Sequence, residues 1–116
     1  MKALWLEEKQ LRLRDDVPLP ELNAGEALIK THLAGICSTD LEMLRGYYPF
    51  TGVLGHEFVG TVVEAPDNPD LIGKRVVGTI SIYCGDCSAC KAGRTGHCEK
   101  RSTLGILNYH GVFAEY

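Results

Sequence analysis

The chain has 116 residues, enough for one domain with a hydrophobic core and too few for two ordinary domains. Charged residues make up 23% and hydrophobic residues 45%, as in soluble globular proteins, and no apolar run is long enough to span a bilayer. The net charge of -3 offers no basic surface for phosphates, so we expect neither a nucleic-acid partner nor a membrane partner.

The first part of the chain has the pattern of short strands. Residues 2–7 and the alternating segment around Leu11 and Leu13 predict a hairpin. The two prolines in residues 17–20 lack backbone donors, so this stretch is expected to be an extended edge segment. A turn at 23–26 and a third strand at 27–33 are expected to follow.

Residues 35–46 predict one short helix. Thr39 and Glu42 have the spacing of a capping box, and Gly46 suits a C-terminal cap. Cys37 is then expected just before the helix, where unpaired N–H groups and the helix dipole favour its thiolate. Taken alone, a single cysteine is more often an inert core residue.

The rest of the chain predicts further short strands. An aromatic loop at 47–50 leads to the pair His56 and Glu57, which Gly55 and Gly60 flank. Strands are expected at 61–64, 75–82, 104–106 and 112–116, with turns at 66–70 and 108–111. Many short strands with few helices predict a mainly β barrel or sandwich.

Four of the five cysteines lie within residues 84–98, in the spacing Cys-x2-Cys-x2-Cys-x7-Cys. Such a set suits a structural zinc ion, whose four thiolates leave no open coordination position. An iron–sulfur cluster is an alternative, but its bacterial pattern has a different fourth spacing and a proline where Glu99 stands. The odd cysteine count and the lack of a recognisable signal peptide disfavour disulfides. We predict a four-cysteine zinc lobe over residues 84–98, with the ligands Cys84, Cys87, Cys90 and Cys98.

Three motifs stand in one order along the chain: GICSTD around Cys37, GHEFVG around His56, and the four-cysteine lobe, followed by GVFAEY at 111–116. Together they resemble the zinc-dependent medium-chain alcohol dehydrogenase family over essentially all of the chain. The resemblance implies that residues 1–116 form the catalytic domain of that family. The expected fold is a mainly β, GroES-like distorted barrel with few short helices.

The resemblance also implies residue roles. Cys37 and His56 match the ligands of a catalytic zinc, which would be the second zinc beside the structural one. Thr39 matches a hydroxyl that hydrogen-bonds the alcohol and passes its proton outward, although it also fits a helix cap. Asp40 matches a carboxylate that orients the ligand histidine, although it also fits a first-turn acid. For Glu57 the resemblance leaves open whether it binds the zinc or stands beside it.

The family reaction is hydride transfer from an alcohol or polyol to NAD or NADP. No Gly-x-Gly-x-x-Gly motif follows a strand, so we expect the Rossmann cofactor domain to be absent from this chain and the chain alone to be inactive. Glu42 and Ser38 depart from common family residues, which leaves the proton exit path and the choice between NAD and NADP open. A cytoplasmic homo-oligomer is expected for the full-length protein. The alternative function is a zinc-stabilised binding module without catalysis.

Overall fold

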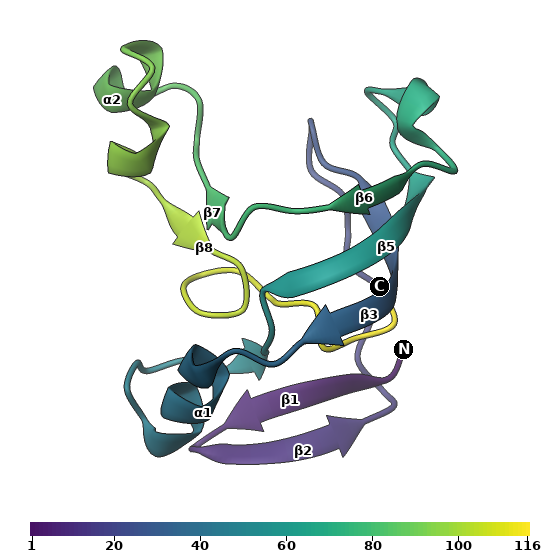
Figure 1. The fold of residues 1–116 in the computed structure, drawn as a ribbon, viewed down its shortest axis with the longest axis vertical. Coiled ribbons are helices and arrows are strands. Elements are labelled where there is room, and N and C mark those ends of the chain that lie inside the picture. Colours follow the sequence, from purple (N-terminus) through teal and green to yellow (C-terminus); the bar gives the residue numbers. More distant parts are fainter.

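The computed structural model describes all residues from Met1 to Tyr116, and most of its regular structure is short antiparallel strands (Figure 1). In chain order the elements are β1 (Ala3–Glu7), β2 (Gln10–Arg14), β3 (Leu28–Gly35), α1 (Ser38–Arg45), β4 (Gly52–Val53), β5 (Glu57–Glu64), the 3-10 helix η1 (Pro69–Leu71), β6 (Arg75–Val77), β7 (Ser81–Ile82), α2 (Ser88–Lys91), the 3-10 helix η2 (Thr95–His97) and β8 (Ser102–Thr103). None of the helices combines the length and the apolar character that crossing a membrane requires.

The first sheet has the strand order β2-β1-β4. Strands β1 and β2 pair from Ala3 opposite Arg14 to Glu7 opposite Gln10, as the alternating pattern predicted. Their turn consists of Glu8 and Lys9, which have φ values of 49° and 64°. Two consecutive left-handed residues match the twist of a tight hairpin, so this turn fixes the register of the two strands.

The second sheet has the order β3-β5-β6, and β3 pairs with β5 along its whole length. The pairing runs from Leu28 opposite Glu64 to Gly35 opposite Glu57, with irregularities after Leu28 and between Thr31 and Leu33. This antiparallel register places the end of β3 beside the start of β5. The segment that follows β3 and the segment that precedes β5 therefore meet at the same end of these two strands.

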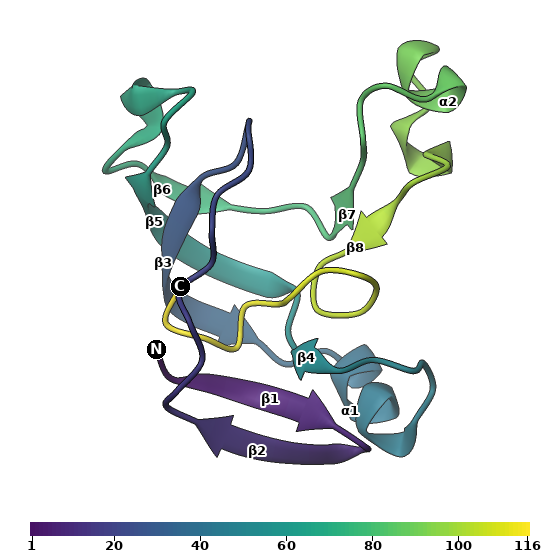
Figure 2. The same cartoon turned by 180° about the vertical axis from the view of Figure 1, so that it is seen from behind.

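The C-terminal segment 112–116 connects the two sheets, and Figure 2 shows it between β1 and β3. The Leu4 N–H donates to the Phe113 carbonyl at 2.8 Å, and the Glu115 N–H donates to the Lys2 carbonyl at 3.1 Å. On the other side, the Thr31 N–H donates to the Glu115 carbonyl at 2.9 Å. The segment thereby links β1, the middle strand of the first sheet, to β3, an edge strand of the second sheet, and closes the barrel.

The buried apolar residues form two neighbouring clusters. One consists of Ala3, Val17 and Val53, and the other consists of Leu6, Met43 and Leu54. Phe113 of the C-terminal segment packs against both clusters. Helix α1 enters the second cluster through Met43, which anchors the helix at the end of the first sheet.

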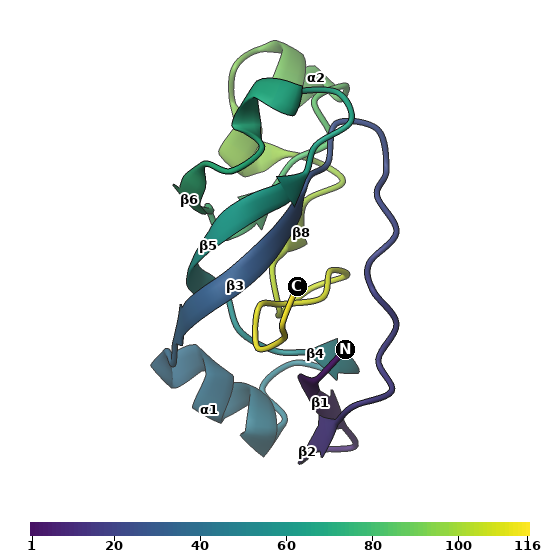
Figure 3. The ribbon, with the colours of Figure 1, turned by 90° about the vertical axis from the view of Figure 1, so that its right-hand side faces the viewer.

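The four-cysteine lobe projects from the body of the molecule. In Figure 1 the chain leaves the second sheet, passes through β7, forms α2 and returns through β8, and Figure 3 shows α2 at the end of the molecule opposite β1 and β2. Strands β7 and β8 pair as Ser81 with Thr103 and Ile82 with Ser102. The lobe is thus attached through a two-stranded stem.

Four sequence-based expectations about elements were wrong. Helix α1 begins at Ser38 with Cys37 as its N-cap, so Thr39 and Glu42 form no capping box. The strand expected at 75–82 is divided into β6 and β7, and the strand expected at 104–106 lies at Ser102–Thr103. The strand expected at 112–116 is reduced to one bridge, between Ala3 and Ala114, because its partners belong to two different sheets.

The packing of the hairpin predicts unequal costs for two leucine truncations. Leu6 is 1% exposed and Leu13 is 71% exposed. Leu6→Ala should lower the free energy of unfolding by about 2–5 kcal/mol, because it leaves a cavity in the core. Leu13→Ala should change it by less than about 0.5 kcal/mol. Urea unfolding at a fixed zinc concentration measures both, and equal losses would contradict this assignment of the core.

Candidate metal centres

Two groups of side chains are arranged as metal ligands, and within each group the ligand atoms lie within 4.8 Å of one another. The first group is the four-cysteine lobe, and the second combines a thiol, an imidazole and a carboxylate. The members are Cys84, Cys87, Cys90 and Cys98 in the first group and Cys37, His56 and Glu57 in the second. The structure thus brings together the residues that the sequence predicted as ligands.

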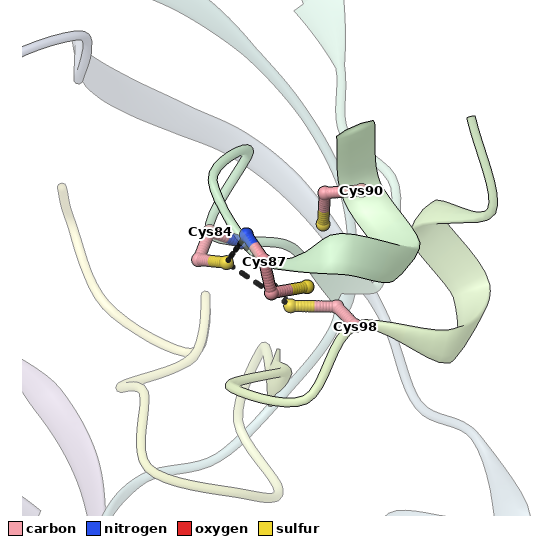
Figure 4. A group of neighbouring side chains, drawn as sticks. All are labelled: Cys84, Cys87, Cys90 and Cys98. Carbon is pink, nitrogen blue, oxygen red and sulfur yellow. Dashed lines mark hydrogen bonds between the residues drawn. The ribbon is translucent and has the colours of Figure 1, made fainter. Parts of the chain in front are cut away.

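The sulfur atoms of the lobe point toward a common centre (Figure 4). The Cys87 N–H donates to Cys84 Sγ at 3.4 Å, and the Cys84 N–H donates to Cys98 Sγ at 3.3 Å. The sulfurs of Cys84 and Cys98 are 3.6 Å apart, which is far longer than a disulfide bond, and all five cysteines are free. Backbone donors aimed at sulfur stabilise thiolates, the form that binds metal.

The thiols of the lobe differ in acidity. Hydrogen bonds from the backbone of Glu99 and Cys90 lower the pKa of Cys87 to about 6. Burial, together with the neighbouring Cys87, raises the pKa of Cys90 to about 12. Without a cation, the four sulfurs therefore do not all ionise together at neutral pH. A bound divalent cation removes this conflict because it deprotonates its thiol ligands, so the group fits a metal ion.

The second group lies where β3 ends and β5 begins. Cys37 is the N-cap of α1, and Glu57 is the first residue of β5, opposite Gly35. The chain bends immediately before His56, at Gly55, whose φ is 94°. A Cβ on Gly55 would lie 2.6 Å from the Phe113 ring, so a side chain could not replace this glycine.

Asp40 connects the two protein segments of this group. It is 3% exposed, and its Oδ2 accepts a hydrogen bond from the Cys37 N–H at 2.9 Å. Its Oδ1 lies 3.5 Å from Nδ1 of His56, which is 6% exposed, and neither of these two buried atoms has another partner. The pair fits an imidazole oriented by a carboxylate, an arrangement that leaves His56 Nε2 free for a metal.

The hydroxyl of Thr39 faces the same group. Its Oγ1 lies 3.6 Å from Cys37 Sγ, and it makes no helix-cap hydrogen bond. The Thr39 N–H lowers the pKa of Cys37 to about 7, with smaller contributions from His56 and from the Thr39 hydroxyl. Cys37 is half-buried, Glu57 is exposed and His56 is buried, so the group has one closed side and one open side. One thiolate, one imidazole and one carboxylate beside an open position form a donor set that suits a catalytic zinc.

Two further polar residues, Glu42 and His110, lie outside both groups. Glu42 is paired with Arg45 on the surface of α1. His110, which we expected to be a turn residue, accepts the Val53 N–H at its Nδ1 at 3.2 Å, and its ring lies 5.3 Å from the Trp5 ring. Gly35 had no predicted role of its own, although it is the first residue of the GICSTD motif and of the segment 35–46 that was expected to form a helix.

The sequence model of the family described as "Alcohol dehydrogenase GroES-like domain" matches residues 23–116. The chain belongs to this family. The predicted resemblance and the predicted mainly β, GroES-like fold are both confirmed.

Two similar relatives are L-threonine 3-dehydrogenases. The protein of Chelativorans sp. (strain BNC1) is 41% identical, and the match covers 99% of this chain and 33% of the relative. The protein of Aeromonas hydrophila subsp. hydrophila is 40% identical, with 100% and 36% covered. The chain thus spans about a third of the length of the curated relatives it matches.

Two solved dehydrogenase structures have the same fold. Alcohol dehydrogenase TADH from Thermus sp. ATN1 has a TM-score of 0.86 at 35% identity, with 99% of this chain and 36% of that chain covered. Haloferax mediterranei glucose dehydrogenase, in complex with NADP, Zn and gluconolactone, has a TM-score of 0.83 at 29% identity. That match covers 99% of this chain and 35% of the other.

The acidity of Cys37 predicts the pH dependence of its alkylation. In the metal-free chain, the rate of Cys37 modification by iodoacetamide should rise with pH and reach half its maximum near pH 7, because only the thiolate reacts. Mass spectrometry of the Cys37 peptide separates this site from the other cysteines. The urea-unfolded chain is the control, and its half-point should move toward the ordinary value of 9.0. Equal half-points in the two states would contradict the role of the helix N-terminus.

Proposed function

We propose that this chain is the metal-binding catalytic domain of a zinc-dependent oxidoreductase that transfers hydride between an alcohol or polyol and NAD or NADP. The observation that carries the proposal is the group of Cys37, His56 and Glu57, which is open on one side and has the Thr39 hydroxyl beside it. Family membership and the relatives named as alcohol, threonine and glucose dehydrogenases support it. Since those relatives are about three times as long, the cofactor domain would lie in a separate part of the full-length protein.

In this proposal, Cys37 and His56 hold the catalytic zinc. Cys37 contributes a thiolate that the N-terminus of α1 stabilises, and Asp40 keeps the Nδ1 side of His56 turned away from the metal. The metal, when bound, would supply Lewis-acid polarisation of an alcohol oxygen, so that the hydroxyl proton leaves more easily. The Thr39 hydroxyl next to Cys37 is placed to accept that proton at Oγ1 and pass it outward. Glu57 either completes the ligand set or stands beside it.

The four-cysteine lobe would hold the structural zinc. Its four thiolates would supply all four ligands of a zinc ion, so this ion would have no open position and no catalytic role. Its contribution would be the folding of the lobe, because a metal that binds only the folded state adds its binding free energy to stability. We further propose that the full-length protein is a cytoplasmic homo-oligomer, as expected for the family.

Metal analysis tests the two centres. After purification under reducing conditions and exhaustive dialysis, the chain should retain one zinc in the lobe and bind a second, more labile one. Cys87→Ala should lose the tight zinc and several kcal/mol of stability. His56→Ala should lose only the labile zinc, because the four ligands of the tight zinc all lie in the lobe, away from His56. Iron with visible absorbance in the lobe, or a second metal that survives His56→Ala, would contradict the assignment.

Turnover tests the reaction class. The full-length protein should reduce NAD or NADP in the presence of a secondary alcohol such as L-threonine, and Thr39→Val should lower kcat while the zinc content stays unchanged. The 116-residue chain alone should show no turnover, because hydride transfer requires the nicotinamide ring to be held against the reacting carbon. Cofactor reduction that is insensitive to Thr39→Val and His56→Ala would refute the proposed site.

A further inference from the structure

Gly35 is a glycine that the backbone conformation does not require. Eight glycines of the chain have a positive φ, and Gly35 is not among them. It is the last residue of β3 and is paired within the second sheet, where an alanine could adopt the same backbone conformation. The reason for a glycine at this position must therefore be space rather than conformational freedom.

The space beside Gly35 is occupied by the side chain of Glu57. Gly35 and Glu57 are cross-strand partners, so a side chain at residue 35 would project on the same face as the glutamate. A Cβ at residue 35 would lie 2.7 Å from Glu57 Oε2 and 3.3 Å from Glu57 Cβ. The Glu57 carboxylate thus folds back over the bare backbone of Gly35 instead of extending away from the strand.

This folded-back position is what places Glu57 with the other ligands. A carboxylate oxygen lies within 4.8 Å of the ligand atoms of Cys37 and His56, and Cys37 follows Gly35 by two residues. No hydrogen bond or ion pair to the Glu57 carboxylate is present in the structure. Since no polar contact holds the carboxylate there, its position depends on the absence of a side chain at residue 35.

We propose that Gly35 is a positioning residue for Glu57, and that it keeps open the space from which the Glu57 carboxylate reaches the second metal centre. This inference rests on the metal centre proposed above. An alanine at residue 35 should cost the fold little, because the closest atom is the far end of a flexible side chain. It should instead move the carboxylate out of the group formed with Cys37 and His56.

Cobalt titration tests this positioning. The lobe is first filled with one equivalent of zinc, and Co²⁺ is then added to the second centre, where its visible spectrum reports the ligands. Gly35→Ala should weaken Co²⁺ binding by roughly 10- to 100-fold, as the loss of an orienting contact does at other metal sites. Its cobalt spectrum and affinity should become those of Glu57→Ala. Adding Gly35→Ala to Glu57→Ala should have no further effect, because the glycine acts only through the glutamate.

A control substitution at another glycine shows whether the loss of Co²⁺ affinity is specific to residue 35. Gly96→Ala is the control, because Gly96 also lacks a positive φ and a Cβ there would meet no atom within 4 Å. An unchanged Co²⁺ affinity in Gly35→Ala, or an equal loss in the Glu57→Ala background, would overturn the inference. So would a Gly35→Ala chain that does not fold, since only the carboxylate should have to move.

A crystal structure of the metal-free Gly35→Ala chain tests the positioning without the metal. The Glu57 carboxylate should have left the neighbourhood of Cys37 and His56, and a carboxylate that stays in place would overturn the inference. If the wild-type chain bound no second metal while the carboxylate moved as expected, the proposed metal centre would be refuted and the positioning role of Gly35 would stand.

Discussion

The antiparallel register between β3 and β5 determines where the ligands of the second centre meet. It sets Gly35 opposite Glu57, so that Cys37, just beyond the end of β3, comes beside His56, just before the start of β5. Successive residues of a strand face opposite sides, and a slip of one residue would send the Glu57 carboxylate to the other face of the sheet. The bend at Gly55 and the packing of Phe113 against it hold His56 on the correct side of this junction.

The two candidate metal centres depend on the fold in different ways. The four-cysteine lobe takes all its ligands from one short stretch and makes its own backbone hydrogen bonds to sulfur, so its geometry is local. The second centre takes its ligands from segments that only the completed sheet brings together. Asp40 then serves both of these segments, since one of its oxygens binds the backbone of Cys37 and the other faces His56. A metal at the lobe and a metal at the second centre are therefore expected to be lost separately.

Local patterns made much of the structure predictable from the sequence. The hairpin followed from the alternation of Leu11 and Leu13 with arginines, and the lobe followed from cysteine spacing. The helix cap was mispredicted because Thr39 and Glu42 satisfied a local rule, whereas Asp40 reaches back to the Cys37 N–H and sets an earlier helix start.

Features that depend on tertiary structure could not be read in the same way. The segment 112–116 has the composition of a strand, but its hydrogen bonds are divided between two sheets, so regular pairing is lost. Likewise, the position of the Glu57 carboxylate depends on a glycine 22 residues earlier, which only the strand register reveals.

The position of the segment 112–116 determines when the barrel can close during synthesis. Because this segment is hydrogen-bonded to Lys2 and Leu4, the barrel cannot close until residues 112–116 have left the ribosome, long after β1 was made. The four-cysteine lobe takes all its ligands from residues 84–98 and emerges before this segment, so the nascent chain can bind an ion there while the barrel is still open.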